Sequence, residues 1–276
     1  MSDTQTKSAA LPQAAGFALM AGVAVAATLA TADRAALAVG LPFLIVLVTA
    51  TASSLPGFPF SAICSALVLP LFPDPVTGVG LVMLCSVANQ VLVVWHLRRA
   101  IRWRMVAIFV AGGSAGVPVG VMLLLTLDRA TVLHVLGIVM ILVAAQRLLL
   151  TQRPRAGTLT VVDLAAGAAS GLLAGFCGPM GAPLVMRAGM KPWLRDEMRG
   201  SVQPAILLVQ VEALICLFLM RGTGLPPILG LSSLVFVPLS LLGCRVGLGV
   251  LSRCTDRGFA RAVNVAVLTS GVALMI

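Results

Sequence analysis

The chain alternates long apolar segments with short polar connections along almost its whole length. Eleven apolar segments can be distinguished, at residues 14–32, 36–54, 60–72, 76–97, 105–126, 130–150, 159–175, 179–190, 200–220, 226–250 and 258–276. A helix needs about 20 apolar residues to cross a bilayer, so most of these segments predict membrane-spanning helices. The segments at 60–72 and 179–190 are shorter, and each follows a Gly/Pro-rich stretch. They therefore predict a broken or re-entrant helix at both places.

Composition supports this prediction and excludes an ordinary soluble domain. Apolar residues make up 59% of the 276 residues, charged residues make up 10%, and the mean hydropathy is +1.08. A membrane β-barrel would instead show short segments of alternating hydrophobicity. The expected fold is all-α, that of a polytopic membrane protein. The six cysteines form no CxxC pair and no Cys/His cluster, so we expect no metal site.

The net charge of +10 is interpreted as basic residues at the ends of membrane helices, and we expect no nucleic-acid partner. If the arginine-rich loop at 98–104 is cytoplasmic, fourteen Lys and Arg residues fall on that side and three on the other. This asymmetry predicts a cytoplasmic N-terminus and an external C-terminus. The segment at 14–32 is interpreted as a retained helix, with cleavage as a signal peptide at Ala30-Thr31-Ala32 left open.

The ten segments that follow the first one suggest a duplication. We divide the chain into an N-terminal tail with an extra helix, a first repeat and a second, inverted repeat, at residues 1–35, 36–156 and 157–276. Each repeat holds five segments, the turn at Asp74 aligns with that at Asp196, and the glycine-rich stretch 116–120 aligns with 243–247. Duplicated halves of opposite orientation are typical of secondary transporters. Chance alignment of glycine-rich helices is the alternative.

The helix expected at 105–126 has GxxxG spacing at 112–116 and again at 116–120. Small residues at this spacing let two membrane helices approach closely. We interpret the motif as packing within the chain rather than as a dimer interface, and the oligomeric state stays open.

The two breaks, at 56–61 and 177–183, form the predicted anion site. A half-helix that begins inside the membrane presents unpaired backbone N–H groups and the positive end of its dipole, and both attract an anion. Two breaks related by pseudo-symmetry would face each other near the bilayer midplane. The candidate binding residues are Gly57, Phe58, Pro59, Ser61, Cys177, Gly178, Pro179 and Gly181. Simple helix kinks are the alternative.

Polar side chains within the apolar segments are further candidates, because each is costly in hydrocarbon unless it faces a cavity or a partner. Asn89 and Gln90 lie in one half, and Gln203 and Gln210 lie in the corresponding segment of the other. These four are predicted to contact the substrate. Glu212 is the one acid well inside a predicted helix. It either carries a proton coupled to transport or hydrogen-bonds a neighbouring glutamine.

Three stretches together resemble the TauE/SafE sulfite exporter family. They are Gly171 to Pro183 (GLLAGFCGPMGAP), its degenerate counterpart Ser54 to Ala62 (SLPGFPFSA), and Leu97 to Trp103 (LRRAIRW), which precedes the Gly/Pro-containing helix. The similarity covers residues 36 to 276. It implies a bacterial inner-membrane exporter or permease for sulfite, thiosulfate or organosulfonates, with no nucleotide or metal cofactor.

Other functions fit the same architecture and stay open at this point. A transporter of another small metabolite would have the same helices, although the scarcity of intramembrane acids argues against a divalent cation. A membrane enzyme or assembly factor would need a nucleophile, a metal cluster or paired acids, and no such motif occurs, so we expect no enzyme. The expected partners are a small anion and membrane lipid. The anion, the direction of transport and the coupling ion stay open.

Overall fold

The computed structural model describes residues 42, 44–51, 59–72, 74–149, 160–178, 181–222 and 236–245, and the positions 265, 268, 269, 271, 272, 274 and 275. Its main elements are α3 (Pro59–Val68), the 3₁₀ turn η1 (Leu69–Leu71), α4 (Pro75–Leu97), α5 (Trp103–Thr126), α6 (Arg129–Leu149), α7 (Thr160–Cys177), α8 (Gly181–Gly189) and α9 (Arg195–Arg221). Residues 44–51 and 236–245 are also helical. The first predicted segment and the predicted repeat boundaries lie outside the described residues.

The all-α prediction is confirmed for the described part of the chain, where every regular element is a helix. Helices α4, α5, α7 and α9 are long and apolar enough to cross a membrane. Their bounds follow the predicted segments closely, with one difference. Helix α9 starts at Arg195, five residues before the apolar segment expected at 200–220. The chain is therefore a multi-pass membrane protein.

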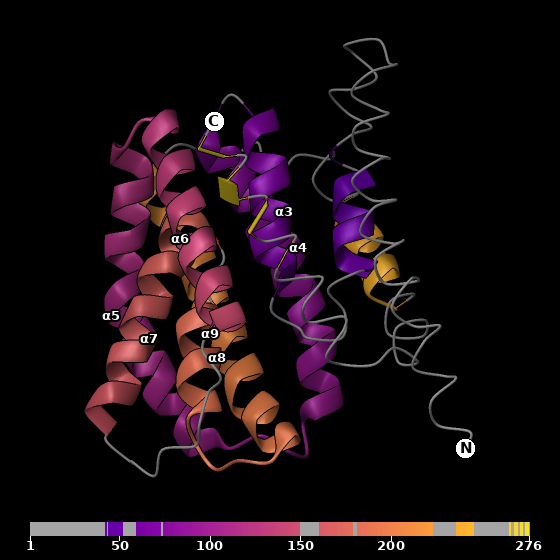
Figure 1. The fold of residues 1–276 in the computed structure, drawn as a ribbon, viewed down its shortest axis with the longest axis vertical. Coiled ribbons are helices and arrows are strands. Elements are labelled where there is room, and N and C mark those ends of the chain that lie inside the picture. The colour runs from indigo at the N-terminus through magenta and orange to yellow at the C-terminus, as the bar shows by residue number, and fades with distance from the viewer. Residues whose placement is uncertain are drawn as a thin grey trace.

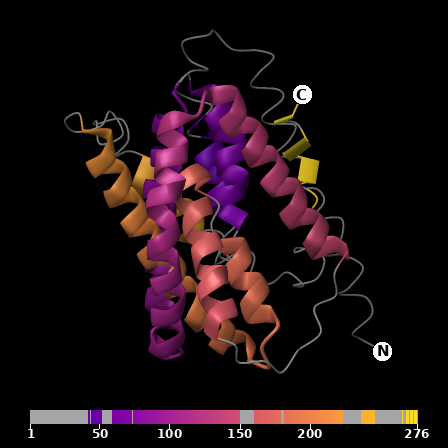
Figure 2. The ribbon, with the colours of Figure 1, turned by 90° about the vertical axis from the view of Figure 1, so that its left-hand side faces the viewer.

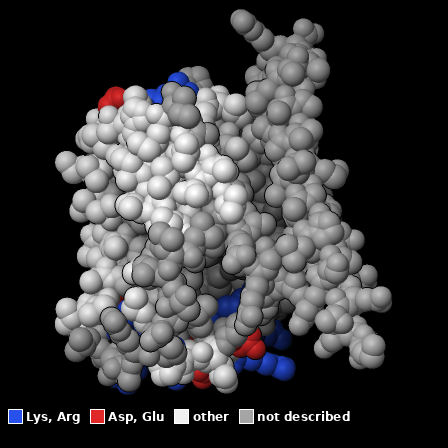
Figure 3. Space-filling view, viewed as in Figure 1, with Lys and Arg blue, Asp and Glu red and all other residues white. Residues whose placement is uncertain are grey.

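Helices α4 and α9 run antiparallel, because their ends pair in opposite order. Arg221 Nη2, at the end of α9, lies 3.0 Å from Asp74 Oδ2, at the start of α4. Arg102 lies in the connection that follows α4, and Glu197 lies near the start of α9. Arg102 Nη1 is 3.6 Å from Glu197 Oε2. Most Lys and Arg side chains visible in Figure 3 gather at the lower end of the molecule. We call this the charged end, and it holds Arg98, Arg102, Arg187, Lys191 and Glu197.

Asp74 begins α4 as its N-cap and accepts hydrogen bonds from the backbone N–H groups of Val76 and Thr77, at 3.1 and 3.3 Å. Burial alone would raise the pKa of Asp74. The hydrogen bonds from Thr77 and Val76 and the nearby Arg221 charge outweigh burial, so the pKa of this carboxyl lies below its usual value. The end of α4 opposite the charged end is thus capped by a carboxylate that also pairs with Arg221.

Helices α5 and α7 lie side by side and pack backbone against backbone (Figures 1 and 2). A Cβ added at Gly175 would lie 2.5 Å from the carbonyl oxygen of Val117, closer than real Cβ contacts come. On α5, Gly112, Gly116 and Gly120 face the carbonyls of Leu164, Ala168 and Leu172; on α7, Gly167, Gly171 and Gly175 face those of Phe109, Gly113 and Val117. The interpretation of the GxxxG spacing as packing within the chain is confirmed.

Helices α7 and α8 form a hairpin that enters the bundle from the charged end and returns to it. Asp163, near the start of α7, lies 2.6 Å from Arg187 Nε, near the end of α8, so both outer ends of the hairpin are at one level. Helix α8 has nine residues and is too short to span a membrane. The other short helix, α3, lies in the opposite half of the bundle (Figures 1 and 2).

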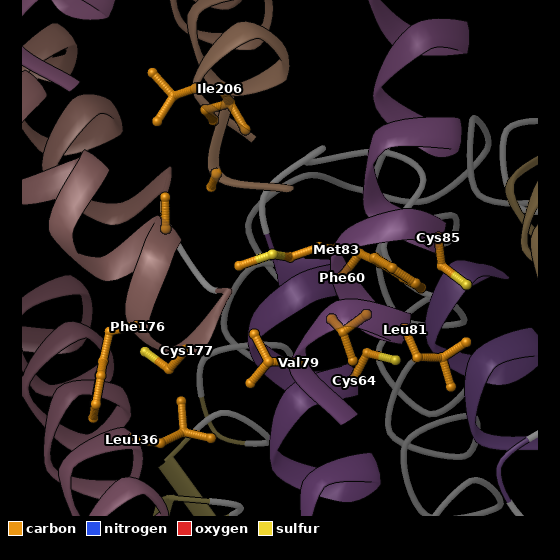
Figure 4. Close-up of a cluster of buried hydrophobic side chains, with 14 of the residues drawn as sticks. Phe60, Cys64, Val79, Leu81, Met83, Cys85, Leu136, Phe176, Cys177 and Ile206 are labelled. Atoms are coloured by element: carbon orange, nitrogen blue, oxygen red, sulfur yellow. The ribbon is translucent and has the colours of Figure 1, made fainter. Parts of the chain in front are cut away.

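One part of the core lies between α3 and α4 on one side and the end of α7 on the other. Phe60 and Cys64 of α3 and Met83 of α4 are buried on one side, and Phe176 and Cys177 of α7 on the other (Figure 4). The hydroxyl of Ser65, on α3, donates a hydrogen bond of 3.1 Å to the carbonyl oxygen of Cys177. Helix α3 therefore contacts the end of α7, next to the break between α7 and α8.

Candidate functional site

The break between α7 and α8 is buried and depends on a glycine. Gly178 has a φ of 86°, a backbone conformation that side-chain-bearing residues rarely adopt. Its N–H donates to the carbonyl oxygen of Leu173 at 3.1 Å, and this bond across five residues closes the end of α7. Cys177 is fully buried, and α8 begins again at the buried Gly181. The predicted second break is therefore present and internal.

The predicted break residues of the first half are described only in part. Gly57 and Phe58, and Pro179 in the second half, lie outside the described residues. Pro59 is the first residue of α3, and Ser61 is buried within the first turn of that helix. The first backbone N–H groups of any helix have no partner within it. The start of α3 therefore presents the type of donor that the sequence predicted.

A group of buried amides lies along α4 and α9, which pack against each other. Asn89, Gln90, Gln203 and Gln210 are each no more than 8% exposed. Gln210 Nε2 donates a hydrogen bond of 2.7 Å to the hydroxyl of Ser86, so the two helices are joined at this level. Seven residues, or about 10 Å of helix, separate Gln203 from Gln210. Asn89 and Gln90 follow Ser86 by three and four residues, and Gln203 precedes Gln210 by seven, so all four amides lie on the helix faces that this hydrogen bond joins.

Several oxygen atoms of these amides have no hydrogen-bond partner among the described residues. They are Asn89 Oδ1, Gln203 Oε1 and Gln210 Oε1. Leaving a buried polar atom unpaired costs roughly 1–3 kcal/mol, so such atoms are rare in folded proteins unless a ligand or water meets them. The amides of α4 and α9 therefore offer buried acceptor oxygens that a small polar ligand could contact.

Glu212 lies on a different face of α9 from the amides. Two residues separate it from Gln210, which is a rotation of about 200° around the helix. Ser114 of α5 donates a hydrogen bond of 2.7 Å to Glu212 Oε2. Leu208 and Ile215, one turn to either side, are 44% and 54% exposed. Glu212 is thus half-buried between α5 and α9, and its hydrogen-bond partner is a serine rather than a neighbouring glutamine.

A second acid, Asp163, was not predicted as a site residue and is only 3% exposed. Its Oδ1 lies 2.6 Å from Arg187 Nε and its Oδ2 lies 2.7 Å from Lys191 Nζ. The Lys191 ammonium also lies 4.9 Å from the centre of the Trp193 ring, on whose face Arg102 lies at 5.3 Å. One sequence signal could have indicated this cluster. Asp163 lies at the start of an apolar segment, and the basic residues Arg187 and Lys191 follow it by 24 and 28 residues.

Comparison with known proteins identifies a family for most of the chain. The family model described as sulfite exporter TauE/SafE matches residues 41–274, a range that includes both breaks, all helices from α3 to α9 and the buried amides. Searches of the curated proteins and of the solved structures found no match.

Proposed function

Because the chain belongs to the sulfite exporter TauE/SafE family, a family of membrane transporters, we propose that it is a secondary transporter of sulfite, thiosulfate or a small organosulfonate. The substrate binds where the break between α7 and α8 meets α3, and no cofactor takes part. Sulfite is the anion that we favour. A transporter of another small metabolite is the alternative, which the assay below separates.

The observation that carries the proposal is the buried break at Gly178. The chain reverses there and α8 starts inside the bundle, so its first backbone N–H groups point into the protein interior with the positive end of the helix dipole. An oxyanion has several acceptor oxygens and no requirement for a side-chain cation at such a site. The contact between Ser65 and the Cys177 carbonyl brings α3 close to the same place.

The buried amides complement this site. An amide offers two N–H donors and one oxygen acceptor, so it can hydrogen-bond both the oxygens of an anion and the proton of a monoprotonated one. Asn89 and Gln203 have unpaired oxygens among the described residues, and both are more than nine-tenths buried. They would therefore serve as polar contacts along the path of the anion between α4 and α9.

Two contacts support an inverted repeat for residues 36–156 and 157–276. The glycine packing of α5 against α7 has a counterpart in the aligned helices, where a Cβ on Gly243 would lie 2.8 Å from the carbonyl oxygen of Leu47. Gly137 and Gly271 also face each other. A Cβ added at Gly137 would lie 2.8 Å from the carbonyl oxygen of Gly271, and one added at Gly271 would lie 3.0 Å from the carbonyl oxygen of Gly137. Contacts that recur between corresponding helices are what two-fold pseudo-symmetry produces.

The proposed orientation places the charged end in the cytoplasm, in a bacterial inner membrane, with the N-terminus inside and the C-terminus outside. Reporter fusions made after Arg102 are expected to read cytoplasmic, and fusions after Asp128 are expected to read external. A cytoplasmic signal from the Asp128 fusion would contradict the orientation, because α5 separates the two positions.

The function is tested with purified protein in proteoliposomes. Vesicles that contain the protein are expected to take up labelled sulfite faster than empty vesicles, with saturation and with competition by thiosulfate or methanesulfonate. Uptake of none of these anions, from protein that remains folded by thermal denaturation, would reject the proposed function. Uptake of an unrelated metabolite in the same vesicles would favour the alternative transporter.

Proton coupling is proposed for Glu212, the half-buried acid hydrogen-bonded to Ser114. Glu212→Gln keeps the shape and the hydrogen-bonding capacity but removes the titratable proton. We expect a pH gradient to stop stimulating sulfite uptake in this variant, while uptake down the sulfite gradient persists. Ser114→Ala serves as the comparison, because it removes the partner and keeps the acid. An undiminished response of Glu212→Gln to the pH gradient would show that the proton is carried elsewhere.

A further inference from the structure

The strongest unexplained feature of the molecule is the ion cluster around Asp163 at the charged end. Each carboxylate oxygen of Asp163 faces a different cation. Oδ1 lies 2.6 Å from Arg187 Nε, and Oδ2 lies 2.7 Å from Lys191 Nζ. The side chains of Asp163, Arg187 and Lys191 are 4%, 11% and 8% exposed, so all three groups are largely removed from water. Replacing buried ion pairs with well-packed apolar residues is often neutral or stabilising, so stability alone does not account for this cluster.

The cluster has more positive than negative charge. One carboxylate serves two buried cations, and the next acid, Glu197, pairs with another cation, Arg102. Trp193 connects the two pairs, because its ring lies close to both Lys191 and Arg102. Exposed Arg98 and Arg99 add positive potential nearby. A small anion arriving at the charged end is therefore attracted to the cluster and compensates its excess charge.

The two cations are arranged to hold an oxyanion. The carboxylate of Asp163 is itself an oxyanion that receives one charge-assisted hydrogen bond on each oxygen. A sulfite or sulfonate group has oxygens at comparable separation and can accept the same two donors. The cluster also joins the outer ends of the α7–α8 hairpin, whose tip is the break at Gly178. Fourteen residues of α7, or about 21 Å of helix, separate Asp163 from that tip.

We infer that Arg187 and Lys191 form a second oxyanion site at the charged end, which the Asp163 carboxylate occupies as an internal ligand and from which an entering anion displaces it. The inference rests on the proposed function only for the chemical class of the ligand. It places a loading step about 21 Å from the central break. Asp163 and the substrate then compete for the same two donors, and the strength of this competition sets the apparent affinity from the charged side.

The test measures anion binding without transport, through the unfolding temperature of detergent-solubilised full-length protein titrated with sulfite, sulfate or chloride. Asp163→Asn keeps the shape and removes the competing charge. We expect the sulfite concentration for half-maximal stabilisation to fall about tenfold, the equivalent of one charge-assisted hydrogen bond of about 1.4 kcal/mol. The matched control is Asp196→Asn, an exposed acid at the same end, which is expected to leave this concentration unchanged.

A second variant keeps the inference testable if Asp163→Asn does not fold. Lys191→Gln leaves the Arg187–Asp163 pair in place and removes one of the two cations, so the half-maximal sulfite concentration is expected to rise about tenfold. If either folded variant matches wild type in this titration, or if chloride stabilises as well as sulfite does, no second oxyanion site exists. Wild-type sulfite uptake in vesicles is scored separately, so that loss of the second site and loss of the proposed function are distinguished.

Discussion

Gly171→Leu is expected to be the most destabilising single substitution in the chain. Gly171 lies in the middle of α7 and its Cα faces the carbonyl of Gly113 on α5, with no space for a Cβ. A leucine there forces apart two helices that meet backbone to backbone over three turns. Overpacking typically costs 1–3 kcal/mol where side chains can shift, and a backbone contact allows less relief. We expect the apparent unfolding temperature to fall by about 10 °C or more.

The control for this change is Ala169→Leu, two residues away on the exposed face of α7. It adds comparable volume where lipid can accommodate it, so the unfolding temperature should stay within a few degrees of wild type. Both variants are measured in the same detergent by a thermal unfolding assay. Equal unfolding temperatures for the two variants would mean that the close contact between α5 and α7 contributes little to stability.

Gly181→Val is expected to abolish sulfite uptake in protein that still folds. Gly181 is the first residue of α8 and is buried. If the first N–H groups of α8 hold the substrate, a branched side chain at this position covers them. The loss of one or two charge-assisted hydrogen bonds corresponds to about a hundredfold loss of affinity. Initial uptake into vesicles that contain matched amounts of protein measures this loss.

Two further variants make the result on Gly181 specific. Gly181→Ala adds a single methyl group and is expected to retain part of the uptake, which gives a graded series. Ala165→Val adds similar bulk on the exposed face of α7 and should transport like wild type. Near wild-type uptake by Gly181→Val would place the anion site away from the break.

Hydrophobic periodicity was sufficient to predict most of the helices. Long apolar segments flanked by arginines have few alternatives in a bilayer, because every backbone polar group must be satisfied within the segment. The start of α9 was predicted less well. Residues 195–199 are polar and suggested a loop, yet they continue the helix because Glu197 reaches back to accept a hydrogen bond of 3.2 Å from the N–H of Leu194. Local capping extended the helix beyond its apolar part.

The buried amides were singled out from the sequence, but their contacts were not predicted. Sequence identified the amides Asn89 and Gln203 because polar groups are costly in hydrocarbon. It did not show that Gln210 bonds Ser86, since that pairing depends on the level at which α4 and α9 cross. The burial of Asp163 also went unpredicted. The residue is near a helix start, where acids are usually exposed, and its partners reach it only because α8 folds back along α7.

The contact between α5 and α7 also has a consequence for biosynthesis. These two helices belong to opposite sides of the connection at residues 150–159, and α6 separates them in sequence. Among the described residues, the glycine face of α5 packs against α7, so a nascent chain that ends after α6 lacks this partner. Neither half of the polypeptide is thus an independent assembly unit. Two separately made fragments, joined only by this contact, would have to meet in the membrane before either became stable.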